Sequence, residues 1–139
     1  MPANTVDAAT IERMILSAPF HKWLGLRLVE LGDDHIAIAL PWREELIADP
    51  VARYTHGGVL ATLIDLTADF AIAAKLGRGV PTIDMRVDYH KAAMPGEDLI
   101  GRGRVIKLGR TVGTAEATVS RTDGTLIASG RGVYLTSAG

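Results

Sequence analysis

The chain has 139 residues, a length typical of one domain, and its formal net charge is −1 at pH 7. Hydrophobic residues make up 47% and aromatic residues 5%, so we expect a core of Ala, Val, Leu and Ile. The absence of cysteine excludes a thiol nucleophile and a thiolate metal site, and the small net charge argues against binding to nucleic acid. The N-terminus lacks the pattern of a signal peptide, and no uncharged apolar run approaches the roughly 20 residues that cross a bilayer. These features predict a cytoplasmic protein with no membrane segment.

The first part of the chain predicts a short helix followed by a hairpin. Residues 7–18 carry apolar side chains at helical spacing, and Pro19 is expected to end that helix. Residues 26–31 and 36–40 alternate in the manner of strands, and Gly32-Asp33-Asp34 supplies the turn between them.

A long apolar segment follows an irregular one. Residues 43–55 show no period, which is typical of a loop. Residues 57–76 carry apolar side chains in almost every direction around a helix, and a helix that is apolar all round is buried all round. Gly77 and Gly79 are expected to end it.

Four strand-like runs complete the chain, at residues 81–91, 98–109, 111–121 and 125–136. The turns between them are short, which predicts an antiparallel meander of four strands. No other segment can cover the long helix, so the sequence predicts an α+β domain in which one antiparallel sheet wraps around that helix. One helix against one sheet leaves the far side weakly covered, which favours a dimer.

Three stretches then match a known pattern: THGGVLATLID at residues 55–65, TIDMRVDYHKAAMPGE at 82–97 and DGTLIASGRGVYL at 123–135. Together they resemble the hotdog-fold acyl-CoA thioesterases of the PaaI-like branch, over about residues 24–135. The resemblance implies one hotdog domain over residues 1–139, with a helical extension at its N-terminus (1–22). It also implies hydrolysis of an acyl-CoA to a free acid and CoA, with no cofactor beyond the CoA of the substrate. The implied assembly is a homodimer with shared active sites, paired further into a homotetramer.

The resemblance assigns roles to five residues. Asp65 matches the catalytic carboxylate, which acts as general base or nucleophile. Gly57 matches the residue whose N–H polarises the thioester carbonyl, and His56 matches the histidine that shapes the entry to the helix. Thr82 stands where a Ser or Thr helps to place the attacking water. Asp49 stands where the family usually has a carbonyl-orienting Asn, and it could donate a hydrogen bond only when protonated; the alternative is that it caps a turn.

Physical arguments support parts of this assignment. The first turn of a helix offers unpaired N–H groups and partial positive charge, and Gly57 and Gly58 would let a substrate approach the backbone closely. Gly57 and Asp65 are eight residues apart, which is about 12 Å along one helix axis. One helix cannot bring both to the same carbon atom, whereas two antiparallel helices from two subunits can. The spacing therefore favours a site shared between subunits.

The remaining candidates have simpler alternatives. Asp69 lies one turn beyond Asp65 and could be a second site carboxylate or the exposed mouth of a pocket, and Asp65 itself could be structural, hydrogen-bonded to Thr82. His90 could lie near the pocket, but the histidines lack the spacing of a metal site, so no metal is expected. Arg110 is the best candidate for binding CoA phosphates in a basic stretch that could instead be a solvated strand face. The alternative functions are another hotdog enzyme, such as a hydratase or dehydratase, or a non-catalytic acyl-binding module.

Overall fold

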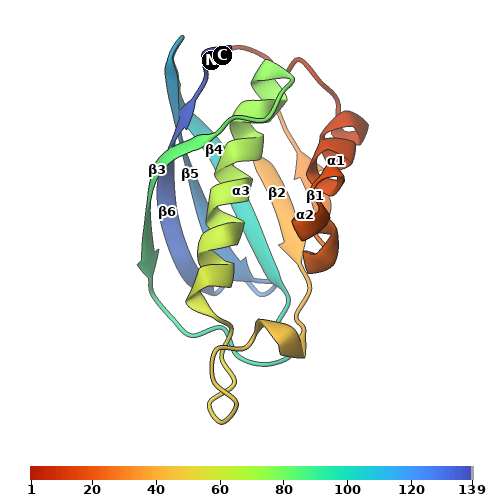
Figure 1. Ribbon diagram of the computed structural model, residues 1–139, viewed down its shortest axis with the longest axis vertical. Coiled ribbons are helices and arrows are strands. Elements are labelled where there is room, and N and C mark those ends of the chain that lie inside the picture. Colours follow the sequence, from red (N-terminus) through yellow and green to blue (C-terminus); the bar gives the residue numbers. More distant parts are fainter. Residues whose placement is uncertain (139) are drawn as a thin grey trace.

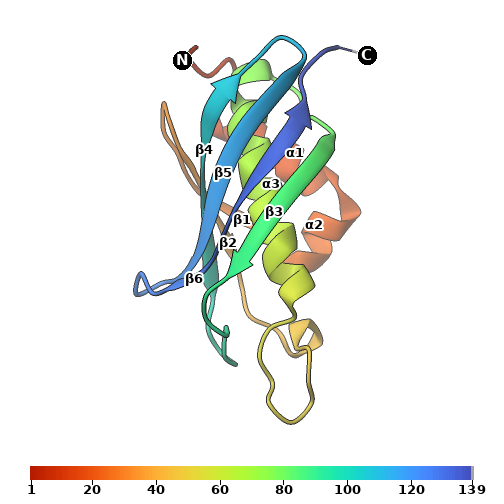
Figure 2. The ribbon, with the colours of Figure 1, turned by 90° about the vertical axis from the view of Figure 1, so that its left-hand side faces the viewer.

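The structure is a computed structural model that describes residues 1–138 (Figure 1). Its helical elements are α1 (Ala8–Ser17), α2 (Pro19–Leu24), the 3-10 turn η1 (Glu44–Leu46) and α3 (Gly57–Leu76). Its strands are β1 (Arg27–Leu31), β2 (Ile36–Leu40), β3 (Thr82–Tyr89), β4 (Leu99–Leu108), β5 (Val112–Arg121) and β6 (Leu126–Leu135). The long helix α3 lies across one face of the sheet, which curves around it (Figures 1 and 2). This arrangement confirms the predicted antiparallel sheet around one helix.

The N-terminal region contains two helices where the sequence predicts one. α1 begins after Asp7, whose carboxylate accepts a hydrogen bond from the N–H of Thr10. Pro19 follows the end of α1 as expected, but it also occupies the first position of α2. That position needs no N–H donor and suits the fixed φ of proline, so the residue that ends one helix starts the next.

The sheet has the strand order β1-β2-β4-β5-β6-β3, and all neighbouring pairs are antiparallel. The predicted β1–β2 hairpin is confirmed, and β4, β5 and β6 form a meander. The predicted four-stranded meander is wrong for its first strand, because β3 pairs with β6 and not with β4. The connection over residues 90–98 carries the chain from the β3 edge to the middle of the sheet, so its Pro-Gly pair does not close a hairpin.

α3 is buried along most of its length, as its composition predicts. His56 is its N-cap, and Gly77, with φ 76°, ends it in the left-handed conformation. Two strand glycines allow the helix to lie close to the sheet. A Cβ added at Gly101 would collide with Thr67 of α3, and one added at Gly130 would collide with Ile64.

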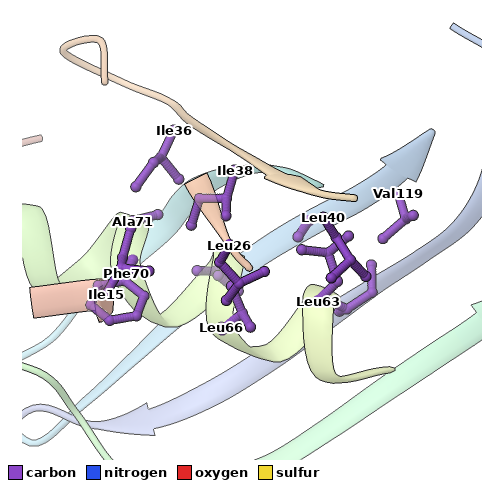
Figure 3. Packing of buried hydrophobic residues seen from close by; sticks show 14 of the residues in the cluster. Ile15, Leu26, Ile36, Ile38, Leu40, Leu63, Leu66, Phe70, Ala71 and Val119 are labelled. Atoms are coloured by element: carbon purple, nitrogen blue, oxygen red, sulfur yellow. The ribbon is translucent and has the colours of Figure 1, made fainter. Parts of the chain in front are cut away.

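The two flanks of α3 differ in what covers them. On one flank, Leu66 and Phe70 of α3 belong to the same apolar cluster as Ile15 of α1 and Leu26 before β1 (Figure 3). On the other flank lies β3, whose inward face is only partly covered: Ile83 is 54% exposed and Tyr89 is 55% exposed. This second flank contains the candidate site.

Candidate active site

Asp65 sits in the middle of α3, on the flank that faces β3. The Thr82 hydroxyl donates to Asp65 Oδ1 over 2.8 Å. The hydroxyl of Tyr134 lies 3.1 Å from the same Oδ1 and 3.0 Å from the Asp65 backbone oxygen. In the described part of the chain, residues 1–138, Oδ2 accepts no hydrogen bond. The structure therefore brings Asp65 and Thr82 together, and leaves one carboxylate oxygen available to a ligand.

Asp69 lies one helical turn beyond Asp65 on the same flank. It accepts a long hydrogen bond, 3.4 Å, from the N–H of Val80, just before β3. Burial raises the pKa of Asp69 to about 7, and the nearby charge of Asp65 adds to the shift. At neutral pH this carboxyl is therefore divided between its neutral and ionised forms, next to a second carboxylate.

The entry to α3 has the geometry of an anion-binding helix end. His56 Nδ1 accepts a hydrogen bond from the Gly58 N–H over 2.8 Å, so the histidine caps the helix. The Gly57 N–H donates no hydrogen bond within residues 1–138. A free N–H at the first position of a long helix is suited to bind an oxyanion.

Two tyrosines in this region were not predicted from the sequence. The Tyr89 hydroxyl donates to the Gly57 carbonyl over 2.9 Å, and its ring lies where a Cβ at Gly57 would touch it at 3.4 Å. Tyr134 is fully buried beneath Asp65. A polar-tipped aromatic at a buried strand position is the signal that could have identified Tyr134, because its hydroxyl must find a partner inside.

Gly57 and Asp65 do not meet within one chain. The eight residues between their positions on the same helix separate them by about 12 Å along its axis. The single chain therefore keeps the carboxylate in mid-helix apart from the free N–H at the helix entry.

Asp49 lies in the loop before α3 and is partly exposed. Its Oδ1 accepts hydrogen bonds from the N–H groups of Val51 (2.7 Å) and Ala52 (2.8 Å). These bonds lower the pKa of Asp49 and favour its ionised form. In the single chain, Asp49 is thus a turn cap, the simpler of the two alternatives that the sequence left open.

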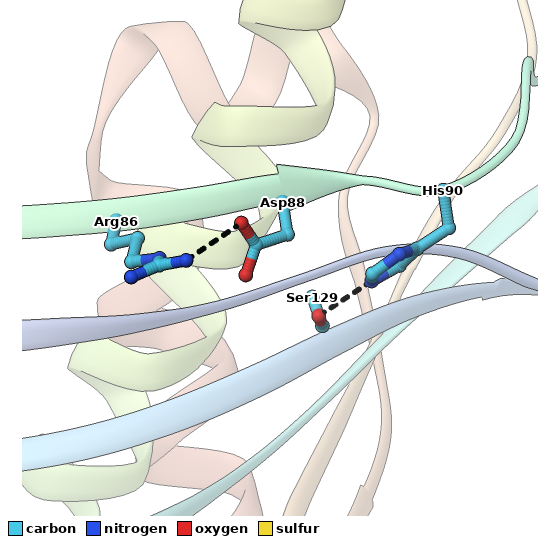
Figure 4. A network of polar contacts seen from close by, with 4 residues as sticks. All are labelled: Arg86, Asp88, His90 and Ser129. Atoms are coloured by element: carbon cyan, nitrogen blue, oxygen red, sulfur yellow. Dashed lines mark hydrogen bonds and ion pairs between the residues drawn. The ribbon is translucent and has the colours of Figure 1, made fainter.

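His90 and Arg110 lie apart from Asp65. His90 follows β3 on the outer face of the sheet, with its Nε2 2.7 Å from Ser129 Oγ (Figure 4). On the same face, Arg86 contacts Asp88 at 3.4 Å (Figure 4). Arg110 is exposed in the β4–β5 turn, at the opposite end of the molecule from the entry to α3 (Figure 2).

A hollow of about 550 Å³ also lies on the outer face, and none of the predicted site residues lines it. Its walls include four arginines: Arg86, Arg102, Arg104 and Arg131. Within residues 1–138, no group of three acidic or histidine side chains could hold a metal ion. No helix in that range has the length and apolar character needed to span a membrane.

Comparisons with known proteins identify the family of this fold. The sequence pattern of the thioesterase superfamily matches residues 53–128, more than half of the chain. An X-ray structure of a thioesterase-superfamily protein is 48% identical, with a TM-score of 0.89, and the match covers 91% of this chain and 96% of that one. The acyl-coenzyme A thioesterase 13 of Mus musculus is 35% identical over 79 residues, which are 55% of this chain and 56% of that enzyme.

The Escherichia coli PaaI protein, from the phenylacetic acid degradation operon, shares the fold. Its TM-score is 0.73 at 17% identity, over 82% of this chain and 85% of that one. The PaaI-like resemblance seen in the sequence is therefore confirmed at the level of architecture. On the family match and the 48% identity, the chain belongs to the thioesterase superfamily.

Proposed function

We propose that the protein hydrolyses acyl-CoA thioesters, with Asp65 as the catalytic carboxylate. The observation that carries the proposal is an aspartate in the middle of a largely apolar helix, held through one oxygen by two hydroxyls while the other oxygen accepts no hydrogen bond within residues 1–138. Burying a carboxylate is costly unless it is hydrogen-bonded, so its place in α3 calls for a role that an apolar residue could not fill.

The chemistry requires little more than this carboxylate and one N–H donor. Acting as a general base, Asp65 takes a proton from water, and the water oxygen bonds to the thioester carbon. The carbonyl oxygen becomes an oxyanion, which the free Gly57 N–H would stabilise, an interaction worth about 3 kcal/mol in comparable sites. The C–S bond then breaks, its electron pair leaves with sulfur, and the thiolate of CoA takes up the proton. Attack by Asp65 itself on the carbon is the alternative route.

The active site is shared between two subunits in this proposal. The separation of about 12 Å between Gly57 and Asp65 supports a shared site, because one chain cannot bring both to a single carbon. The edge strand β3 supports it further: it is eight residues long and lies at the end of the sheet. A long edge strand with exposed apolar side chains is a surface on which a second chain pairs. The further assembly into a tetramer stays a prediction.

The relatives support an acyl-CoA as the substrate class. The name of the mouse enzyme states this activity for that protein, and the match covers 56% of its length. The basic stretch that ends at Arg110 would bind phosphates of CoA, and we expect the protein to act in the cytoplasm. A panel of CoA esters, from acetyl to aryl to long-chain, would identify the acyl group. Release of the free thiol measures the hydrolysis of each ester.

The decisive variant is Asp65→Asn, which keeps the shape of the side chain and removes the base. We expect kcat to fall by about 10²-fold or more while the fold is retained. Asp34→Asn is the matched control, because it removes an exposed carboxylate from the β1–β2 turn. If Asp65→Asn turns over the panel at the wild-type rate, the assignment is wrong. Binding of an acyl-CoA by the wild type without thiol release would point to a non-catalytic module.

Subunit mixing tests the shared site. Gly57→Pro deletes the N–H at a helix position that accepts proline, after a residue (His56) already in an extended conformation. Gly57→Ala is its control, since it keeps the N–H and adds only an ordinary contact with Tyr89. Gly57→Pro and Asp65→Asn should each be inactive alone, and their purified heterodimer should regain one intact site of two. An inactive heterodimer would place the complete site within one chain.

A further inference from the structure

The hydroxyl of Tyr134 reaches one residue, Asp65. The side chain is fully buried near the end of β6, and its hydroxyl points at Asp65, 3.1 Å from Oδ1 and 3.0 Å from the backbone oxygen. The backbone oxygen of Asp65 lies inside α3, where the helix already supplies it with an N–H donor four residues on. The carboxylate has no such donor from its own helix, so it is the group that gains from the tyrosine.

The strand is built to let this side chain reach the helix. Tyr134 and Gly132 lie two residues apart on β6, so their side-chain positions point to the same face. A Cβ at Gly132 would come within 2.5 Å of the Tyr134 ring. The Gly132-Val133-Tyr134 sequence therefore clears the space through which the ring extends under α3.

A second hydroxyl arrives from the neighbouring strand. Thr82 is the cross-strand partner of Tyr134 in the β3–β6 pairing, so the two side chains stand next to each other on the inner face. Both hydroxyls contact Oδ1 of Asp65, at 2.8 Å for Thr82 and 3.1 Å for Tyr134. Two donors on one oxygen fix the rotation of the carboxylate and leave the lone pairs of Oδ2 unoccupied by the described residues.

We infer that Tyr134 is a positioning residue which, together with Thr82, clamps Oδ1 of Asp65 so that Oδ2 is the oxygen presented to the reactants. This inference rests on the proposed function, and it goes further by stating which oxygen of the carboxylate acts. Tyr134 touches neither water nor thioester in this arrangement and acts only through Asp65.

The surroundings of Tyr134 keep its hydroxyl protonated, so that it can donate a hydrogen bond. The titratable groups that face it are Asp65 and Asp69 of α3. Thr82 from β3 and Gly113 from β5, its cross-strand neighbours, do not titrate. Burial raises the pKa of Tyr134, and the charges of the two aspartates raise it further. The hydroxyl therefore holds its proton at neutral pH.

The test is Tyr134→Phe, which keeps the ring and removes only the hydroxyl. The expected result is a fall in kcat of roughly 5–10-fold, the worth of one hydrogen bond, with KM changed less than about twofold. The acidic limb of the kcat/KM profile should also move to higher pH, because the ionised carboxylate has lost a donor. Tyr54→Phe is the matched control: Tyr54 is 40% exposed, and its hydroxyl makes no hydrogen bond within residues 1–138.

The outcomes separate this inference from the proposed function. If Asp65→Asn is inactive but Tyr134→Phe has the wild-type kcat and an unmoved acidic limb, the clamp is wrong and the proposed function stands. If Asp65→Asn is active, the proposed function itself fails. Should Tyr134→Phe not fold, Thr82→Val decides, since Thr82 is exposed and outside the core. It must move the acidic limb in the same direction and Thr82→Ser must restore it, whereas an unmoved limb overturns the inference.

Discussion

The two flanks of α3 are covered to different extents. On the β1 flank, the edge strand has five residues and a bulge between Leu28 and Glu30, and α1 packs beside it. On the β3 flank, the edge strand has eight residues and packs against α3, while α1 and α2 lie on the far side of that helix (Figure 1). A short, irregular and covered edge is protected from pairing with another chain, whereas a long and open edge invites it.

The two carboxylates of α3 both lie on the open flank. Leu66 and Phe70 face the closed flank and are buried, whereas Asp65 and Asp69 face the open one. The free-energy cost of partly burying a carboxylate is smallest where hydroxyls, backbone N–H groups and solvent can reach it. The difference teaches that one flank combines a long open edge with the carboxylates of α3, and the proposed shared site would need both.

The largest expected effect comes from placing a charge on the open edge. Ile83→Lys puts an ammonium group on β3 where the second chain would pair, and burying it there is costly. We expect the dissociation constant of the dimer to rise about 100-fold, which corresponds to about 2.7 kcal/mol. Activity should fall in parallel as the protein is diluted. Light scattering and thiol release over a dilution series measure both effects.

Val29→Lys is the matched substitution on the closed edge. Val29 is 46% exposed on β1 and Ile83 is 54% exposed on β3, so the two variants add the same charge at similar exposure. The β1 variant should keep the oligomeric state and activity of the wild type. If both variants dissociate the protein, or neither does, the distinction between the two edges is wrong.

Much of this architecture is visible in the sequence because it depends on local patterns. The apolar run of residues 57–76 and its glycine end predicted α3 with its observed bounds, and the β1–β2 hairpin followed from alternation and a turn. The pairing of β3 with β6 was missed because tight turns describe neighbours in sequence, and the connection over residues 90–98 spans the sheet. Alternation within β3 is the same whichever strand it joins.

The sequence motif predicted the central carboxylate of the candidate site, but the sequence did not predict every hydroxyl that contacts it. The motif at residues 55–65 identified Asp65, and geometry adds Thr82 as its donor, as the structural alternative expected. Tyr134 lies 69 residues from Asp65 along the chain, so only the register of β6 under α3 reveals their contact. The shared site and the roles of Asp49, His90 and Arg110 stay predictions, because they depend on a second chain.

A smaller effect should come from the pH dependence of stability. Burial raises the pKa of Asp69 to about 7, above its ordinary value of 3.8. Between these values the folded protein binds a proton that the unfolded chain has released, so the free energy of unfolding falls as pH rises from about 4 to 7 and levels off above. A shift of about three units corresponds to at most about 4 kcal/mol, and residual solvent contact reduces it to roughly 2. Urea unfolding at several pH values measures this slope.

Asp69→Asn isolates the contribution of this one carboxyl. The asparagine side chain at position 69 cannot ionise, so the free energy of unfolding of the variant should lack the decline expected for the wild type between pH 4 and 7. Other titrating groups are common to both proteins and cancel in the difference. Equal slopes for the two proteins would mean that Asp69 titrates like an exposed carboxylate and that the open flank is more solvated than its burial indicates.

The smallest expected effect is that of Asp49→Asn. Two backbone N–H groups bind Asp49 Oδ1 and lower the pKa of this carboxyl, so it is ionised at neutral pH and cannot donate as the family's asparagine does. An asparagine can accept the same two hydrogen bonds through its amide oxygen, so stability should change by less than about 0.5 kcal/mol.

If Asp49 is only a turn cap, the kcat/KM profiles of wild type and variant should superimpose over pH 5–9. If the dimer instead brings Asp49 beside the partner's carboxylate, one proton would be shared by the pair, and wild-type activity would decline as that proton is lost. The asparagine would then supply a permanent donor and extend activity to higher pH, so a widened profile would place this loop in the active site and assign Asp49 to the open flank.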